Sequence, residues 1–214
     1  MNLKQILEIT AREAPQKPAI ILGSEKISYR ELDERSNRIA NALTSSGLKK
    51  GENVAILMSH RPEWVSHYFG IIKAGGVAVL LSSALKAPEL DSLLRDSETS
   101  VLITEKRFSR MLASVLPTLP GLRRVLEIDT SSYQAVISSG PALSPDVAIN
   151  PEDVATIIYT SGILGRQKGV VHTHASLLGT PEIVSAGIGR SREDVVVDPV
   201  PFFYLLGLSE LLFG

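Results

Sequence analysis

The chain has 214 residues, of which 44% are hydrophobic, and its 22 basic and 23 acidic side chains give a net charge of −1. These values exclude a generally disordered chain, which is poor in apolar residues, and disfavour nucleic acid as the main partner, because that role usually brings a basic excess. Without cysteine the chain has no disulfide, thiolate nucleophile or cysteine-ligated metal. We expect a soluble, cytoplasmic protein with no transmembrane segment, because the sequence has neither the order of a signal peptide nor a spanning apolar stretch.

The N-terminal quarter predicts two helices around a small hairpin. Apolar residues recur at helical spacing until Pro15 ends the first helix. A hairpin then turns at Gly23-Ser24. The capping-box pair Ser28 and Glu31 opens the second helix.

From residue 50 onward, short apolar runs alternate with helical patterns, the first of which begins at Pro62. The predicted strands are 54–58, 77–81, 101–104, 125–128 and 154–159. Strands alternating with helices indicate βαβ units, and their nearly continuous apolar character indicates a sheet covered on both faces. We therefore predict an α/β fold with a doubly wound, mostly parallel sheet flanked by helices. Residues 130–152, rich in serine and proline, are predicted to be an internal loop or linker with room for one short element.

The segment that carries chemistry directly follows the last of these strands. It reads Thr160-Ser161-Gly162-Ile163-Leu164-Gly165-Arg166-Gln167-Lys168-Gly169. Glycines let backbone N–H groups converge on an anion, and a lysine adds a positive charge. The spacing is not that of the common P-loop. By itself it leaves two interpretations open, a phosphate-binding loop and a plain glycine-rich turn.

This loop resembles the signature loop of the adenylate-forming enzymes, which include acyl-CoA synthetases, peptide-synthetase adenylation domains and luciferases. The family pattern is Tyr-Thr-Ser-Gly-Thr-Thr-Gly-x-Pro-Lys-Gly-Val, and this chain matches it at 159–162, Gly165 and 168–170. Other blocks similar to the family follow in the right order, at 28–32, 37–43, 51–57, 73–76 and 194–208. The chain is identified as a member of this AMP-dependent synthetase and ligase family. Residues 1–214 would form part of its N-terminal AMP-binding domain.

The resemblance implies a two-step reaction. A carboxylate attacks the α-phosphate of ATP, pyrophosphate leaves with Mg²⁺, and the acyl-adenylate passes to a thiol, commonly coenzyme A. The residues that would hold the ATP phosphates are Thr160, Ser161, Gly162, Gly165, Lys168 and Gly169. Tyr204 and Gly207 would belong to the wall of the acyl site. No residue of this chain is assigned a catalytic role, and none a metal.

The chain departs from the family pattern at several positions. Ile163, Leu164, Gln167, Tyr204, His60 and Leu80 replace Thr, Thr, Pro, His, Asn and Pro, in that order. The two lost hydroxyl groups of the loop matter most, because a hydrogen bond to a charged partner contributes about 1.5–3 kcal/mol. Tyr204 can still form hydrogen bonds, but a phenol does not become a cation at neutral pH.

Three hypotheses follow. The first is the N-terminal part of an acyl-CoA synthetase-like ligase that does not complete adenylation alone. The second is a non-catalytic nucleotide-binding or interaction module derived from the family. The third is an unrelated α/β protein with a glycine-rich turn. The apolar run at 205–213 also predicts self-association through the C-terminal end.

Two other patterns favour structural interpretations. His172 and His174 would share a strand face, as a metal pair does, but the sequence offers no third ligand. Trp64, Tyr68 and Phe69 lie at helical spacing and are predicted to be core residues rather than a ligand platform.

Overall fold

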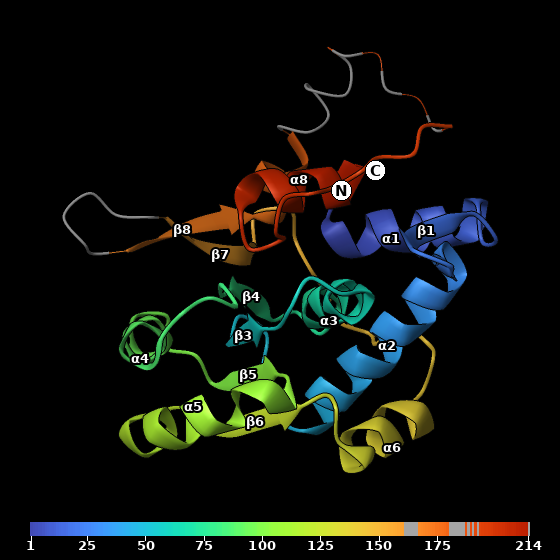
Figure 1. Cartoon of the computed structure of the whole chain (residues 1–214). Helices are drawn as coiled ribbons and strands as arrows, with labels where there is room; N and C mark the ends of the chain where they lie inside the picture. The colour runs from blue at the N-terminus through green and yellow to red at the C-terminus, as the bar shows by residue number, and fades with distance from the viewer. Residues whose placement is uncertain (161–166, 180–186, 188, 190, 192, 214) are drawn as a thin grey trace.

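The computed structural model describes residues 1–160, 167–179, 187, 189, 191 and 193–213. Within these residues six strands form the central sheet, in the order β6-β5-β3-β4-β7-β8 (Figure 1). The strands are β3 (Asn53–Leu57), β4 (Val77–Leu80), β5 (Val101–Thr104), β6 (Arg124–Glu127), β7 (Val154–Thr160) and β8 (Lys168–Thr173). Every pairing is parallel except that of β8, which runs antiparallel to β7 at the edge. The predicted mostly parallel sheet is confirmed.

Helices cover both faces of this sheet, as the doubly wound prediction requires. One face packs against α1 (Leu3–Glu13), α2 (Tyr29–Ser45), α3 (Pro62–Lys73), α6 (Ser131–Ser139) and α8 (Leu205–Phe213). The other packs against α4 (Ala87–Asp96), α5 (Ser109–Val115) and the short 3₁₀ turns η1 (Lys106–Phe108) and η2 (Leu116–Thr118). A separate antiparallel hairpin joins β1 (Pro18–Leu22) to β2 (Glu25–Ser28) beside α2.

The strands are apolar throughout because each alternate side chain enters a different core. Val54 and Ile56 of β3 belong to the cluster that includes α1, α2 and α3. Ala55 and Leu57 belong to the cluster that includes α4 and α5. With period-2 alternation and both faces covered, neither face of a strand can be polar.

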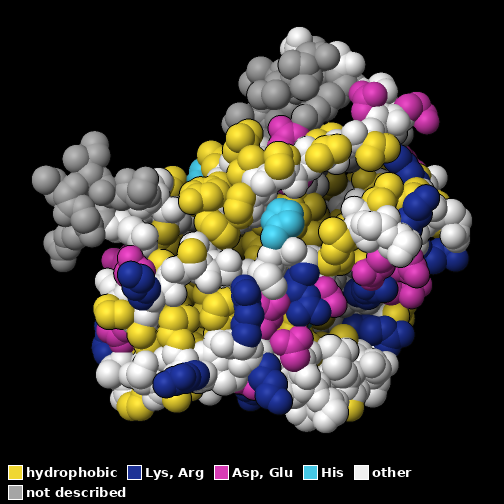
Figure 2. Space-filling model, in the orientation of Figure 1, with side chains coloured by type: hydrophobic (Ala, Val, Ile, Leu, Met, Phe, Trp, Pro, Cys, Tyr) yellow, Lys and Arg dark blue, Asp and Glu magenta, His cyan; other side chains and the backbone are white. Residues whose placement is uncertain are grey.

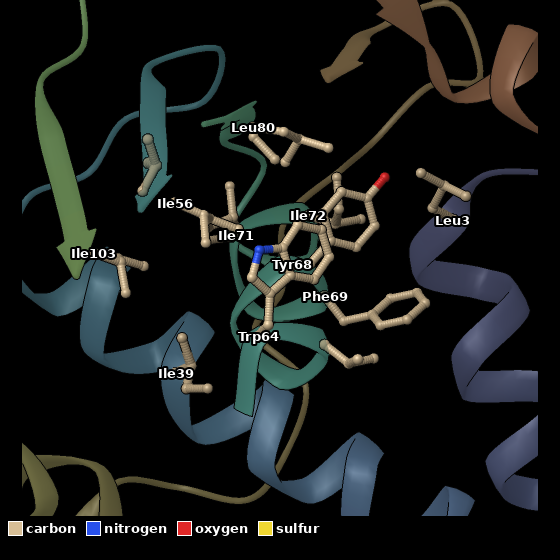
Figure 3. Packing of buried hydrophobic residues seen from close by; sticks show 14 of the residues in the cluster. Leu3, Ile39, Ile56, Trp64, Tyr68, Phe69, Ile71, Ile72, Leu80 and Ile103 are labelled. Carbon is tan, nitrogen blue, oxygen red and sulfur yellow. The ribbon is translucent and has the colours of Figure 1, made fainter. Parts of the chain in front are cut away.

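Helix α3 lies at the centre of the larger core, where Figure 3 shows its aromatic side chains among aliphatic ones from the sheet and neighbouring helices. Trp64 and Tyr68 stack with ring centroids 5.5 Å apart, and the Tyr68 hydroxyl lies 3.1 Å from Thr156 Oγ1 of β7. Trp64, Tyr68 and Phe69 are all buried. The prediction that they are core residues is confirmed.

A buried ion pair joins α3 to α2. The Lys73 ammonium is fully buried and donates to Asp33 Oδ1 at 2.5 Å and to Asn37 Oδ1 at 2.6 Å. Burial lowers the pKa of Lys73, opposed by its bonded carboxylate. The pair therefore links the two helices, and the Asp33 carboxylate compensates the buried charge of Lys73.

Local signals placed several helix ends correctly. Ser28 and Glu31 form both hydrogen bonds of the capping box at the start of α2, and Pro62 is the first residue of α3. Helix α2 ends at its C-cap, Ser46. The next residue, Gly47, has a φ of 89°, the left-handed conformation that glycine commonly adopts after a helix.

The segment 130–152 contains α6, whose N-cap Thr130 accepts from the backbone of Tyr133. The rest of this segment lies along α1 and α2. Asn41 of α2 donates to the carbonyl of Leu143 at 2.8 Å, and Lys4 of α1 donates to that of Pro145 at 2.8 Å. These bonds fix a stretch that has no regular secondary structure of its own.

Candidate functional site

The antiparallel pair β7–β8 brings the two ends of the predicted phosphate loop together. Thr160, the last residue of β7, pairs with Lys168, the first residue of β8. The Thr160 hydroxyl lies 3.5 Å from the Lys168 carbonyl oxygen, and both side chains are exposed. The predicted contacts Ser161, Gly162 and Gly165, with the departures at 163 and 164, lie outside the described residues.

Gly169 lies where an added side chain would be crowded. It pairs with Tyr159, and an added Cβ would lie 3.0 Å from Ile157 Cγ2 and 3.3 Å from the Tyr159 ring. The Tyr159 hydroxyl donates to Asp96 Oδ2 of α4 at 2.6 Å. Burial, reinforced by this carboxylate, raises the pKa of Tyr159. Tyr159 thus anchors the base of the loop to α4.

A groove of about 250 Å³ opens beside this hairpin. It is lined by Leu80, Ser82, Ala84, Leu85, Glu89, Leu93, Tyr159, Gln167, Phe203 and Tyr204. Strands β4 and β7 are parallel neighbours, so their carboxyl ends meet at this edge, where open α/β sheets bind ligands. A larger hollow of about 340 Å³ lies at the β1–β2 hairpin and the start of α2, where Glu31 already caps the helix.

The segment preceding α8 forms the other wall of the groove. Phe202 stacks on His60 with ring centroids 3.9 Å apart and lies 5.0 Å from the Trp64 ring. Tyr204 lines the groove and is 52% exposed. Gly207 of α8 is buried, and an added Cβ there would lie 2.6 Å from the backbone carbonyl oxygens of Val200 and Pro201. Figure 2 shows hydrophobic side chains gathered over the part of this face where Figure 1 places α8 and the end of the sheet.

His172 and His174 take separate structural places. His172 is half-buried in β8, and burial lowers its pKa. His174 is buried; its Nδ1 accepts from the Leu3 backbone N–H of α1 at 3.4 Å, and burial lowers its pKa to about 4. Among the residues that the structure describes, no group of three or more His, Asp or Glu side chains could hold a metal ion.

One charged cluster at the same edge of the sheet was missed from the sequence. Glu105, directly after β5, accepts from Arg61, and Arg61 also bonds Glu63 and Asp129. Burial opposes ionisation of Glu105, but hydrogen bonds from Ser59 and Arg61 outweigh it and hold the pKa of this carboxyl below its ordinary value. The sequence feature that could have indicated this cluster is an acidic residue, Glu105, directly after the apolar run of a buried strand.

Known proteins carry the same fold and sequence pattern. The sequence model of the family described as "AMP-binding enzyme" matches residues 7–214. The chain belongs to the AMP-binding enzyme family. It is 30% identical over 216 residues to long-chain-fatty-acid–CoA ligase FadD13 of Mycobacterium tuberculosis, covering 100% of this chain and 43% of FadD13. It is 32% identical over 178 residues to tyrocidine synthase 3 of Brevibacillus parabrevis, covering 83% of this chain and 3% of that protein.

Solved structures of AMP-binding enzymes agree with the fold. The inhibitor-bound N-terminal domain of FACL13 from Mycobacterium tuberculosis matches with a TM-score of 0.88 and 28% identity, over 99% of this chain and 54% of that one. The long-chain-fatty-acid–CoA ligase FadD1 of Archaeoglobus fulgidus matches with a TM-score of 0.90 and 26% identity, over 100% of this chain and 45% of that one. This chain therefore corresponds to the N-terminal portion of such enzymes. In its described part, no helix is long and apolar enough to cross a membrane.

Proposed function

We propose that this chain supplies the phosphate-binding hairpin and part of the acyl-site wall of an AMP-forming acid–thiol ligase. The observation that carries the proposal is the position of the signature segment, whose ends Thr160 and Lys168 meet at the carboxyl end of β7 beside a groove lined by Tyr204. ATP, Mg²⁺, a carboxylic acid and coenzyme A would be its ligands. Because the chain spans 43% of FadD13, the complete reaction is proposed for a whole enzyme.

The described donors suit a triphosphate. The exposed Lys168 ammonium and Thr160 hydroxyl lie at the mouth of the hairpin, where a cation and a hydroxyl donor would neutralise and orient phosphate oxygens. Bound Mg²⁺ would offset charge on the departing pyrophosphate. Tyr204 would contact the ligand as a neutral hydrogen-bonding group.

Calorimetry with ATP·Mg²⁺ tests the proposal. We expect binding by the wild-type chain and a loss of about 10- to 150-fold in affinity for Lys168→Ala, since a hydrogen bond to a charged group contributes about 1.5–3 kcal/mol. Lys26→Ala, a matched change on the distant β2 strand, should leave the affinity unchanged. Binding unaffected by Lys168→Ala would contradict the assigned loop.

A second candidate function is a non-catalytic nucleotide-binding or interaction module. It is favoured by Tyr204, which stands at the family's histidine position, and by Ile163 and Leu164, which replace two hydroxyl residues of the loop. The double variant Ile163→Thr/Leu164→Thr distinguishes a weakened nucleotide-binding loop from an interaction role. Tighter ATP·Mg²⁺ binding by this variant supports the loop, whereas no heat from either protein at millimolar nucleotide supports an interaction role.

Self-association and a cytoplasmic location belong to the same proposal. Leu205 and Leu206 of α8 are 44% and 59% exposed, an apolar pair that a second copy could cover. Light scattering over a concentration series should show dimers or larger species that Leu205→Ser/Leu206→Ser reduces. A monomer at every concentration would contradict self-association.

A further inference from the structure

The carboxylate of Glu105 holds the chain on both sides of His60. Its side chain is 4% exposed. From Ser59, the residue before His60, the carboxylate accepts hydrogen bonds from the backbone N–H at 3.1 Å and from the hydroxyl group. From Arg61, the residue after His60, it accepts a hydrogen bond at 3.1 Å. Arg107 adds a further bond at 2.8 Å.

These contacts cross the sheet from one strand end to the next. Glu105 follows β5, and His60 lies in the connection between β3 and α3. Strands β3 and β5 are parallel neighbours, so both connections leave the sheet at the same edge. The hydrogen bonds of Glu105 to Ser59 and Arg61 therefore hold the backbone on both sides of His60, and this fixes the direction in which the His60 side chain points.

His60 passes this constraint to the wall of the candidate site. Its ring stacks on Phe202 at 3.9 Å with an interplanar angle of 24°. Phe202 lies two residues before Tyr204, whose backbone N–H donates to the Pro201 carbonyl at 3.0 Å. A shift of the imidazole would thus move the short turn that presents Tyr204 to the groove.

We propose that Glu105 is a positioning residue of the candidate site: it fixes His60, and His60 holds Phe202 and the turn carrying Tyr204 over the edge of the sheet. That the site binds nucleotide rests on the proposed function, whereas the link from Glu105 to Phe202 stands on these contacts alone. Glu105 acts entirely through its neighbours and touches no reacting group.

A carboxylate is needed because every partner of Glu105 is a donor. In Glu105→Gln, an amide NH₂ replaces one accepting oxygen. On either side of the carboxylate it faces an N–H group of Ser59, Arg61 or Arg107, which cannot accept a hydrogen bond from it. Asp129→Asn is the matched control. It is the same carboxylate-to-amide change in the same network, but Asp129 bonds Arg61 and the backbone of Lys106, on one side of His60.

The test compares NMR spectra and fluorescence of the full 214-residue chain. In the wild type, ring current from Phe202 should shift the His60 ring protons upfield, and His60→Asn assigns their resonances. Trp64, the single tryptophan, reports the position of Phe202 from 5.0 Å. We expect Glu105→Gln to lose the upfield shift and change the Trp64 emission, and Asp129→Asn to keep both.

A folded Glu105→Gln chain with wild-type His60 shifts and Trp64 emission would overturn the proposal. Where Glu105→Gln does not fold, Ser59→Ala removes one donor only; partial loss of the His60 shift supports the proposal, and an unchanged shift overturns it. The same samples, titrated with ATP·Mg²⁺, separate the two claims. An absent response in the wild type counts against the proposed function, while the ring-proton comparison still decides the role of Glu105.

Discussion

Replacing Gly70 by alanine puts a methyl group where α2 and α3 already touch. An added Cβ would lie 2.5 Å from Ile39 Cγ2, 2.7 Å from Ile39 Cβ and 3.3 Å from the Ser36 carbonyl oxygen. Rotation of Ile39 cannot relieve the contact with its own Cβ, and the carbonyl belongs to the backbone of α2. The helices themselves must therefore separate.

The magnitude follows from two opposing effects. Overpacking a well-packed core costs about 1–3 kcal/mol, and this contact belongs at the upper end because rigid atoms make it. Alanine is favoured over glycine inside a helix by about 1 kcal/mol. The free energy of unfolding should fall by about 2 kcal/mol, equivalent to a melting temperature lower by about 4–8 °C for a chain of this size.

Urea unfolding followed by circular dichroism and by Trp64 fluorescence measures the effect. Gly179→Ala is the control, because among the described residues no atom lies within 4 Å of a Cβ added to that helical glycine, so the stability of this variant should be unchanged or slightly higher. In a double-mutant cycle, Ile39→Ala should cost less in the Gly70→Ala background, with a coupling above about 0.5 kcal/mol. Wild-type stability for Gly70→Ala, or strict additivity with Ile39→Ala, would show that the two helices accommodate the methyl group.

Three further predictions concern buried polar groups and the start of α8. Lys73→Met leaves the Asp33 carboxylate without its cation and should lower the free energy of unfolding by about 3–5 kcal/mol, whereas Arg95→Met, in an exposed helical pair, should lower it by less than about 0.5 kcal/mol. Burial lowers the pKa of His67 to about 4, below its ordinary value near 6.5, so stability is full above about pH 6.5 and falls as the pH drops towards 4. Urea titrations at pH 7 and pH 5 measure how far the free energy of unfolding falls between these pH values. The fall should be about 2 kcal/mol smaller in His67→Gln than in the wild type, and equal falls would contradict this. Gly207→Ala, whose Cβ would meet two backbone carbonyls at 2.6 Å, should speed amide hydrogen exchange in α8, and unchanged exchange would show that the turn has room.

The parts of the fold that local chemistry determines could be predicted from the sequence. Apolar runs placed the buried strands, because a strand covered on both faces needs nonpolar residues throughout. The pair Ser28 and Glu31 and the position of Pro62 placed two helix starts to the residue, because caps depend on neighbours within one turn. Helix α6 was harder to locate within 130–152, since its serines resemble those of a loop and it buries no residue fully.

In the candidate site, too, only the features that are local in the sequence could be predicted. The order of the sequence placed Thr160, Lys168 and Gly169 in one predicted loop, and the structure brings them together at one hairpin. The link from Glu105 to His60 could not be predicted, because the two lie 45 positions apart and meet only through the pairing of β5 with β3. Sequence spacing carries no information about which strand ends become neighbours until the sheet order is known.

The central claim is that the hairpin mouth at Thr160 and Lys168 binds phosphate. The most direct measurement is a titration of the ¹⁵N-labelled chain with Mg²⁺·pyrophosphate, followed by amide chemical shifts. We expect saturable shifts at Thr160, Lys168 and Gly169. Shifts confined to the hollow at the β1–β2 hairpin, or no shifts at millimolar pyrophosphate, would contradict this claim.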